Sequence, residues 1–254
     1  IDLYRETSSS SKFVERKVLF ADVNDPNPQA ITSFNVEAAK YKVLVWCDYV
    51  QDDVRESWYY ITDDLTKILY SDIEVVDNND KDVFTNMVEV DLSEFYYLEG
   101  DFEIVRQVDL NRPKGRYKCI TTDADDYLKS AGTSIEDITA VVQYTQYVSA
   151  GYNVEEQKPN HFSETRSYLS TVSVDDVNSE GKLEFAYDYV LVNGKQTNVK
   201  INFEFYKGVV TKGRDGVLYK QGGVAVTEDD KISNWSGVVV PLKRNMETVV
   251  EGRF

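Results

Sequence analysis

The residues of this sequence that could carry out chemistry are few and scattered. His161 is the only histidine, and it lies in a Lys-Pro-Asn-His-Phe-Ser stretch that is typical of a loop. General-base catalysis needs a partner that orients the imidazole and a pocket that holds the substrate. The nucleophile pattern Gly-x-Ser-x-Gly and a glycine-rich phosphate loop are both missing. We therefore expect no enzyme and no cofactor.

One acidic set has the spacing of a calcium loop. Asn78, Asp80, Asp82 and Glu89 fall at relative positions 1, 3, 5 and 12 of an EF-hand loop. The glycine that such a loop needs at position 6 is Val83 here, and Glu89 belongs to a strand-like stretch. The set is more typical of a polar turn that precedes a strand, so we expect no bound metal ion.

Aromatic side chains could instead stack on sugar rings. Neighbouring aromatics in an extended chain point to opposite faces, so at most one of each pair can enter a given core. Packing between sheets is the main alternative use of such rings. A glycan-binding surface would need at least two of four rings exposed on one face: Trp58, Tyr59, Tyr96 and Trp235.

The charge of the chain excludes two classes of partner. The formal net charge is −16 and the isoelectric point is about 4.5, so nucleic acid and anionic lipid surfaces would be repelled. The sequence contains no apolar run of about 18 residues that could span a membrane. The opening Ile1-Asp2-Leu3-Tyr4 is typical of the end of a strand, and we expect that a leader preceded it in the precursor.

Two cysteines are too few for a disulfide scaffold. Cys47 and Cys119 each lie in an apolar, strand-like run. We expect buried free thiols, and the alternative is a disulfide if the two strands are neighbours.

The pattern of apolar residues predicts an all-β protein. Tyr, Phe, Val and Ile recur in short runs with regular turn signals between them. The pattern predicts strands throughout, including 31–36, 41–50, 102–110, 116–121, 138–148, 166–173, 183–191, 196–206, 222–226 and 248–254. Two hairpins are expected, one through residues 111–115 and one through Asn193-Gly194.

A single short helix is expected in the middle of the chain. Thr122 can cap it, three aspartates suit its amino-terminal end, and Gly132 can end it. Strands at regular spacing on both sides predict two tandem β-sandwich domains. We place the boundary after the helix, which gives an N-terminal domain of residues 1–133 and a C-terminal domain of residues 134–254.

Four motifs resemble the fimbrillin-like surface proteins of the Bacteroidales. Tyr41-Lys-Val-Leu-Val-Trp-Cys-Asp-Tyr49 resembles their "VWADY"-type strand, and Asp82-Val-Phe-Thr85 their "DAFTG" element. Residues 110–118 resemble the "L-x-RPxAK" strand pair, and residues 241–254 the "PxxRNxxTxVxGxFLT" ending. The motifs occur in order over residues 41–254. Cys47 departs from the usual alanine, and Lys114-Gly115 departs from the usual small residues.

The resemblance implies a fold and a role. It implies two transthyretin-like β-sandwiches and a lipoprotein precursor that is exported to the outer membrane, where the subunit joins surface fimbriae. Its partners would be other fimbrial subunits, joined by strand addition, and a host or bacterial surface receptor. Membrane contact would occur only through a lipid anchor that lies outside this sequence.

The resemblance also implies processing by an arginine-directed protease. Carried onto this sequence, the cleavage loop would be residues 6–12, with Arg5 as the first processing point and Arg16 as the second. The simplest alternative is an ordinary loop beside an incidental arginine. We expect residues 248–254 to pair inside the second sandwich, and any exchangeable strand to lie beyond them or at residues 1–5.

Two readings of function follow. The first is a structural and adhesive fimbrial subunit without catalysis. The second is a surface-anchored module that binds a glycan or another ligand.

Overall fold

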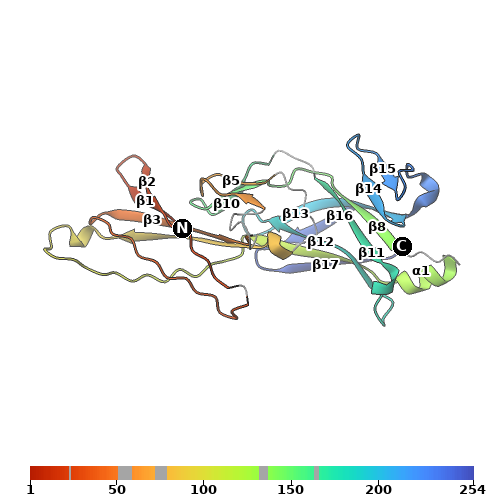
Figure 1. Cartoon of the computed structure of the whole chain (residues 1–254), viewed down its shortest axis with the longest axis horizontal. Helices are drawn as coiled ribbons and strands as arrows, with labels where there is room; N and C mark the ends of the chain where they lie inside the picture. Colours follow the sequence, from red (N-terminus) through yellow and green to blue (C-terminus); the bar gives the residue numbers. More distant parts are fainter. Residues whose placement is uncertain (23, 51–58, 72–78, 132–136, 163–165) are drawn as a thin grey trace.

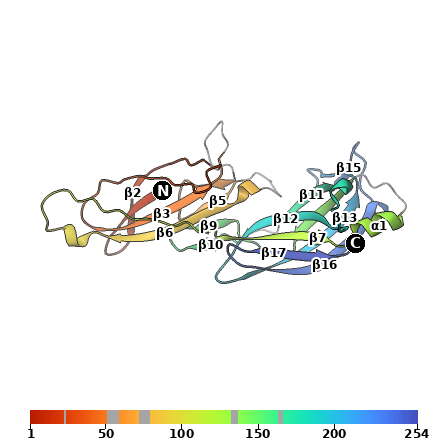
Figure 2. The same ribbon diagram turned by 90° about the horizontal axis from the view of Figure 1, so that it is seen from below.

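The protein is elongated and built almost wholly from β-strands (Figure 1). The computed structural model describes residues 1–22, 24–50, 59–71, 79–131, 137–162 and 166–254. Two hydrophobic cores lie one after the other along the long axis (Figures 1 and 2).

The first core lies between two small antiparallel sheets. The larger sheet has the order β2 (Ser11–Arg16), β1 (Asp2–Glu6), β3 (Lys40–Asp48) and β6 (Val83–Asp91). The smaller sheet has the order β10 (Lys158–Asn160), β9 (Gly151–Asn153), β5 (Ile68–Tyr70) and β4 (Tyr60–Ile61). Alternate side chains point to one face, and they enclose a core of Leu44, Tyr59, Tyr60, Leu65, Ile68, Val83, Tyr152, Val154 and Leu191.

The second core is a larger sandwich. One sheet has the order β11 (Ser167–Ser173), β8 (Asp137–Tyr144), β13 (Thr197–Lys207) and β16 (Lys231–Leu242). The other has the order β12 (Leu183–Leu191), β7 (Lys114–Thr121) and β17 (Glu247–Gly252). Edge-to-face rings fill the space between the sheets, which is the geometry that aromatic pairs prefer: Phe185, Phe203, Phe205 and Trp235.

The remaining elements are short. A two-stranded ribbon, β14 (Val210–Lys212) and β15 (Leu218–Lys220), projects from the end of the second sandwich (Figure 1). The 3-10 turns are η1 (Asn79–Lys81), η2 (Ser93–Phe95), η3 (Val174–Asp176) and η4 (Glu228–Asp230).

The expected helix is present as α1 (Ala124–Ala131), the single α-helix among the described residues. Its first hydrogen bond runs from the Tyr127 amide to the Asp123 carbonyl, so Asp123 holds the capping position that we expected for Thr122. The Thr122 hydroxyl instead donates to the carbonyl of Gly252 in β17. The Gly132 end of the prediction lies outside the described residues.

The C-terminal strand pairs as expected. β17 runs parallel to β7, from Glu247 beside Arg116 to Gly252 beside Thr121. The amide of Phe254 donates to the Asp123 carboxylate at 3.0 Å, and its ring packs on Phe205. The end of the chain is therefore part of the second sandwich.

The expected domain boundary near residue 133 does not separate the two cores. β7 and α1 precede that point, yet they belong to the second core. β9 and β10 follow it, yet β9 pairs with β5 in the first core. The chain enters the second sandwich, returns to the first core and enters the second again, which a division into continuous stretches cannot describe.

Five local predictions were wrong for related reasons, among them the strand at 222–226 and the hairpin through residues 111–115, which the structure does not contain. Residues 31–36 and 102–110 alternate like strands, but the structure leaves them outside every sheet. The turn at Asn193-Gly194 exists, with Gly194 at φ +68°, but it joins β12 and β13 across the two sheets instead of pairing them. Alternation predicts an extended segment, and turn residues predict a reversal of the chain. Which sheet a strand joins depends instead on tertiary packing.

The β17 strand offers a test of this packing. A methyl group on Gly252 would overlap the indole ring of Trp235, which the phenylalanine cluster holds in place. We expect Gly252→Ala to lower the free energy of unfolding by about 2 kcal/mol, measured by urea unfolding. Glu251→Ala, at the exposed neighbouring position, should change it by less than about 0.5 kcal/mol. Equal effects of the two substitutions would contradict the packing.

Candidate functional site

The first predicted processing point, Arg5, lies in an inner strand. β1 pairs with β2 on one side and with β3 on the other, and Arg5 faces Lys12 and Tyr41 across the two ladders. Its guanidinium forms an exposed ion pair with Glu37 at 2.9 Å. The backbone around Arg5 is thus paired with a strand on each side, and a protease could bind this segment only after the sheet opens.

The second predicted point, Arg16, ends the edge strand β2. Its guanidinium donates two hydrogen bonds to the carboxylate of Asp2, each 2.6 Å long, and Asp2 is buried. These bonds raise the pKa of Arg16 above its ordinary value. The pair ties the two strands of the hairpin together at the end opposite the turn.

The serine-rich segment is a closed hairpin turn. The Thr7 amide donates to the Ser10 carbonyl at 2.8 Å, and the Thr7 hydroxyl donates to the same oxygen. Glu6 belongs to β1, and Ser11 and Lys12 belong to β2, so the flexible loop expected over residues 6–12 is limited to the turn itself.

The geometry distinguishes the two arginines. A cut after Arg16 would free the complete β1–β2 hairpin and leave β3 with an open edge. A cut after Arg5 would free β1 alone and leave β2 without a neighbouring strand. Processing at either residue stays a prediction.

The rings considered for glycan stacking do not form a platform. Tyr59 is buried in the first core, and Trp235 packs against the second. Tyr96 is exposed, whereas Trp58 lies outside the described residues. Of the described members of the set, only Tyr96 is largely exposed to solvent.

The other candidates from the sequence are dispersed. Asp82, from the calcium-like set, is ion-paired with Arg112 at 2.6 Å; Asn78 lies outside the described residues. No group of three or more potential metal ligands occurs among the described residues. Cys119 is buried and outside any disulfide, as expected, but Cys47 is exposed and lies in the other core's sheet. No helix in the described part of the chain is long and apolar enough to cross a membrane.

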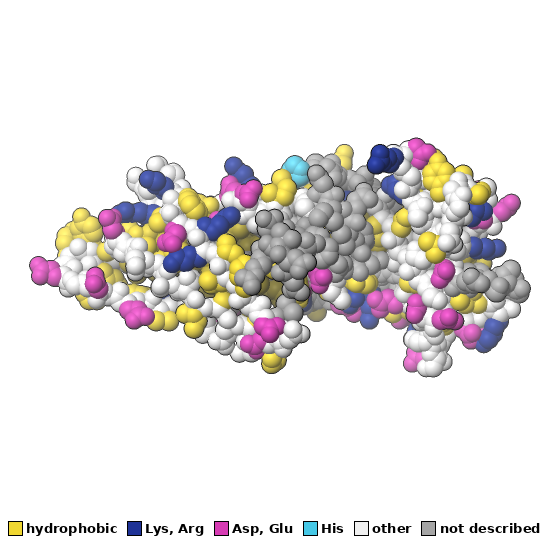
Figure 3. Space-filling model, in the orientation of Figure 1, with side chains coloured by type: hydrophobic (Ala, Val, Ile, Leu, Met, Phe, Trp, Pro, Cys, Tyr) yellow, Lys and Arg dark blue, Asp and Glu magenta, His cyan; other side chains and the backbone are white. Residues whose placement is uncertain are grey.

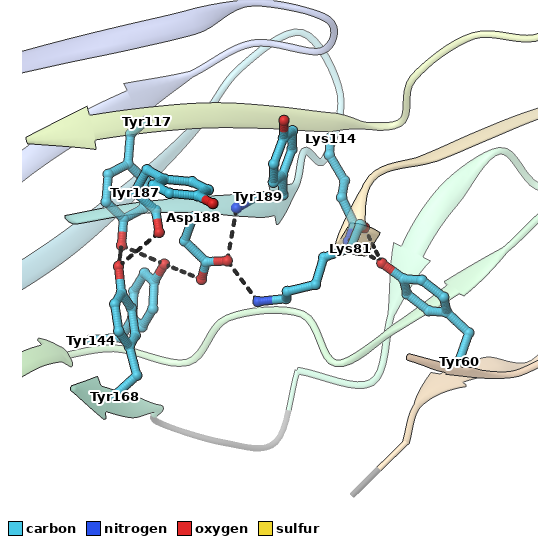
Figure 4. A network of polar contacts seen from close by, with 9 residues as sticks. All are labelled: Tyr60, Lys81, Lys114, Tyr117, Tyr144, Tyr168, Tyr187, Asp188 and Tyr189. Carbon is cyan, nitrogen blue, oxygen red and sulfur yellow. Dashed lines mark hydrogen bonds and ion pairs between the residues drawn. The ribbon is translucent and has the colours of Figure 1, made fainter. Parts of the chain in front are cut away.

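A buried polar network lies where the two cores meet (Figure 4). Lys81 from η1 forms an ion pair with Asp188 in β12, with 2.7 Å between Nζ and Oδ1. Both side chains are about nine-tenths buried. The hydroxyl of Tyr144 donates to the other carboxylate oxygen at 2.9 Å. The ion pair therefore joins the turn before β6 to the centre of the second sandwich.

Three tyrosines continue the network into the second core. The hydroxyl of Tyr117 contacts those of Tyr144 at 2.9 Å and Tyr168 at 2.8 Å (Figure 4). Burial, followed by the charge of Asp188, raises the pKa of Tyr117 and Tyr144 well above the ordinary value. These phenols stay protonated and act as hydrogen-bond donors and acceptors.

Lys114 is a second buried cation on the other side of the network. Its Nζ donates to the Lys81 carbonyl at 2.7 Å and to the hydroxyl of Tyr60. It lies 4.9 Å from the ring centres of Tyr60 and Tyr70. Burial, and then the charge of Lys81, lowers its pKa well below 10.5, because burial disfavours the charged amine and Lys114 forms no ion pair with a described residue.

A further set of contacts closes the junction. Arg112 donates to Asp82 and, at 2.7 Å, to the Asn245 side chain of the second sandwich. Arg244 donates to the carbonyls of Val192 and Gln157. The sequence analysis missed the whole network. Asp188 stands between two tyrosines in a strand, and this was the one local signal of a buried carboxylate.

The two lysines should respond differently to the same substitution. Lys81→Met leaves the Asp188 carboxylate buried without a cation, and we expect it to lower the free energy of unfolding by about 3 kcal/mol. Lys114→Met removes an amine that forms no ion pair with a described residue, while the Tyr60 hydroxyl still donates to the Lys81 carbonyl, so we expect a much smaller loss. Urea unfolding at neutral pH measures both, and a larger loss for Lys114→Met would refute this assignment.

The pH dependence of stability gives a separate test of Lys114. Its pKa is lowered in the folded protein, so the unfolded chain binds more protons between that value and 10.5. The free energy of unfolding should therefore rise with pH between the lowered pKa of Lys114 and the ordinary value of 10.5. Above that range the buried tyrosines reverse the trend, since their pKa is raised in the fold. Lys114→Met should flatten the rise, and an unchanged slope would show that Lys114 is not its source.

Solved structures with a similar arrangement come from Bacteroides. Two are from Bacteroides ovatus and are each described as a "putative adhesin". One has 8% sequence identity and a TM-score of 0.46, covering 99% of this chain and 85% of its own. The other has 13% identity and a TM-score of 0.46, covering 98% and 80%. A third, with the same description, is from Bacteroides thetaiotaomicron, with 10% identity, a TM-score of 0.37 and coverage of 85% and 69%. Similarity at this level does not assign a function.

The sequence itself matches one family model. No curated protein is significantly similar to this chain. The resemblance to fimbrillin-like proteins therefore stays a prediction. The matching model is described as a family of unknown function (DUF6562), and it covers residues 1–216, from β1 into the ribbon that precedes β16 and β17. Because the match extends over most of its length, the chain belongs to the DUF6562 family.

Proposed function

We propose that this chain is a non-catalytic, structural and adhesive subunit of cell-surface fimbriae, which joins other subunits by strand addition. The observation that carries the proposal is the β1–β2 hairpin. It forms one side of the first sheet, covers the edge of β3, and ends at Arg16.

The position that β1 occupies is suited to a donated strand. β1 contributes four paired positions to β3, from Asp2 beside Leu44 to Arg5 beside Tyr41. Asp2 and Leu3 are 1% and 3% exposed. Loss of the hairpin would uncover unpaired backbone groups on β3 together with the space filled by Leu3, and an edge of this kind binds an extended strand.

The assembly step follows from this geometry. An arginine-directed protease would cut after Arg16, and the Asp2–Arg16 bonds and the two ladders would hold the hairpin until a donor strand from another subunit displaces it. In the proposed setting a lipid anchor outside this sequence holds the precursor at the outer membrane.

Strand exchange after cleavage tests the proposal. The intact chain is cut with an arginine-specific protease, and a fluorescent peptide of residues 1–16 is added. Fluorescence anisotropy should show binding to the cut chain and none to the uncut chain. A Leu3→Ala peptide loses a buried side chain, which costs about 2 kcal/mol and should weaken binding about 30-fold.

Three outcomes would count against the proposal. The protease could leave the Arg16 bond intact in the folded protein, or the cut chain could fail to bind the peptide. Equal binding of the two peptides would mean that the Leu3 space is not the site of exchange. A chain with Arg16→Gln controls for cuts elsewhere and should stay closed to the peptide.

A further inference from the structure

The first sheet has a second open edge, on β6. The outer side of β6 makes one rung, in which Thr85 and Asn111 exchange hydrogen bonds of 2.9 and 3.0 Å. No backbone–backbone hydrogen bond between described residues involves residues 99–110. This segment alternates like a strand, and the Asn86 side chain of β6 holds its end by donating to the Asp109 carbonyl at 2.7 Å. Beyond this point the outer edge of β6 has no strand partner among the described residues.

This edge carries exposed apolar side chains together with many acidic ones. We call β6 and residues 92–110 the acidic edge. Its exposed apolar side chains include Tyr97 at 89%, Val105 at 78% and Phe102 at 50% exposure. Residues 89–110 contain seven acidic residues and one arginine. In the space-filling view, apolar and acidic side chains gather at this end of the molecule (Figure 3). Asp101 and Glu103 form no ion pair with a described residue.

The opposite end of the molecule has the complementary character. The β14–β15 ribbon lies there in both ribbon views (Figures 1 and 2). Residues 207–220, the basic ribbon, contain four basic residues and one aspartate. Lys207, Lys212 and Arg214 are exposed and form no ion pair with a described residue. Val209 and Val217 add exposed apolar surface.

We propose that the acidic edge of one copy binds the basic ribbon of a second copy. The ribbon's backbone would continue the sheet beyond β6, and its cations would lie against Asp101 and Glu103. The occupant is a second copy because this chain itself carries a complementary ribbon, held at the far end of the same elongated body. The inference rests on the proposed function for its setting in an assembled fibre, but it involves neither Arg16 nor the hairpin.

The symmetry of the contact determines which kind of assembly it forms. The two surfaces differ and lie at opposite ends, so the contact is heterologous, and repetition gives an open row instead of a closed dimer. Charge attraction between exposed groups is screened by salt, so the row should form at low ionic strength and dissolve at high ionic strength.

Sedimentation velocity on the uncut chain tests this contact. The weight-average mass should rise with protein concentration in low salt and return to that of the monomer in high salt. An end-reversed variant at the ribbon, Lys212→Glu with Arg214→Glu, should stay monomeric. So should an end-reversed variant at the edge, Asp101→Lys with Glu103→Lys. Lys195→Glu changes an exposed charge in the β12–β13 turn and should associate like the parent chain.

Mixing the two end-reversed variants gives the sharpest result. Each keeps one natural end, and the two reversed ends carry opposite charges, so a mixture should recover association, with natural and reversed contacts alternating along the row. A parent chain that stays monomeric in low salt would overturn the proposal. So would association that both reversals leave unchanged. Because the hairpin is uncut throughout, these outcomes are independent of strand exchange at β3.

Discussion

The ion pair between Lys81 and Asp188 is the contact on which the arrangement of the two cores depends. It places a cation from the first core against the centre of the second sandwich, away from water. A buried charge without a partner is costly, so the two cores cannot shift relative to each other without a large loss of stability. The tyrosine hydroxyls extend this constraint into β7, β8 and β11. We therefore expect the two sandwiches to keep one fixed arrangement relative to each other.

The edge strands of the two sandwiches differ in how well they are protected from pairing with another chain. In the second sandwich the last strand is fastened by the Phe254 amide and ring, and Pro241 lies in an edge strand, where proline removes a donor that a new strand would need. In the first core, β6 and β2 both end the sheet without such protection. The unprotected edges of the larger sheet of the first core therefore lie at one end of the molecule, and the β14–β15 ribbon lies at the other.

The sequence predicted local structure better than pairing. β12 was placed at its observed bounds and β11 to within one residue, because alternation and turn residues act locally. β16 was missed, since Gly237 and Pro241 interrupt its pattern, although an edge strand with a positive-φ glycine tolerates both. Residues 102–110 have a strand pattern, but among the described residues they form no backbone–backbone hydrogen bond, since alternation alone does not supply a neighbouring strand. Lys81, Lys114 and Asp188 come from three distant segments, and spacing along the chain cannot reveal such a meeting.

The path of the chain through the two cores also determines when it can fold. The first core needs Tyr152, Val154 and Leu191 before it is complete, and β17 reaches back across 130 residues to Thr122 beside β7. The first core can therefore close only after β12 has joined it, and the second only after β17 has paired with β7. Each sandwich thus depends on strands that are far apart in the sequence, and contacts of this kind form slowly because long loops must close before the strands can pair.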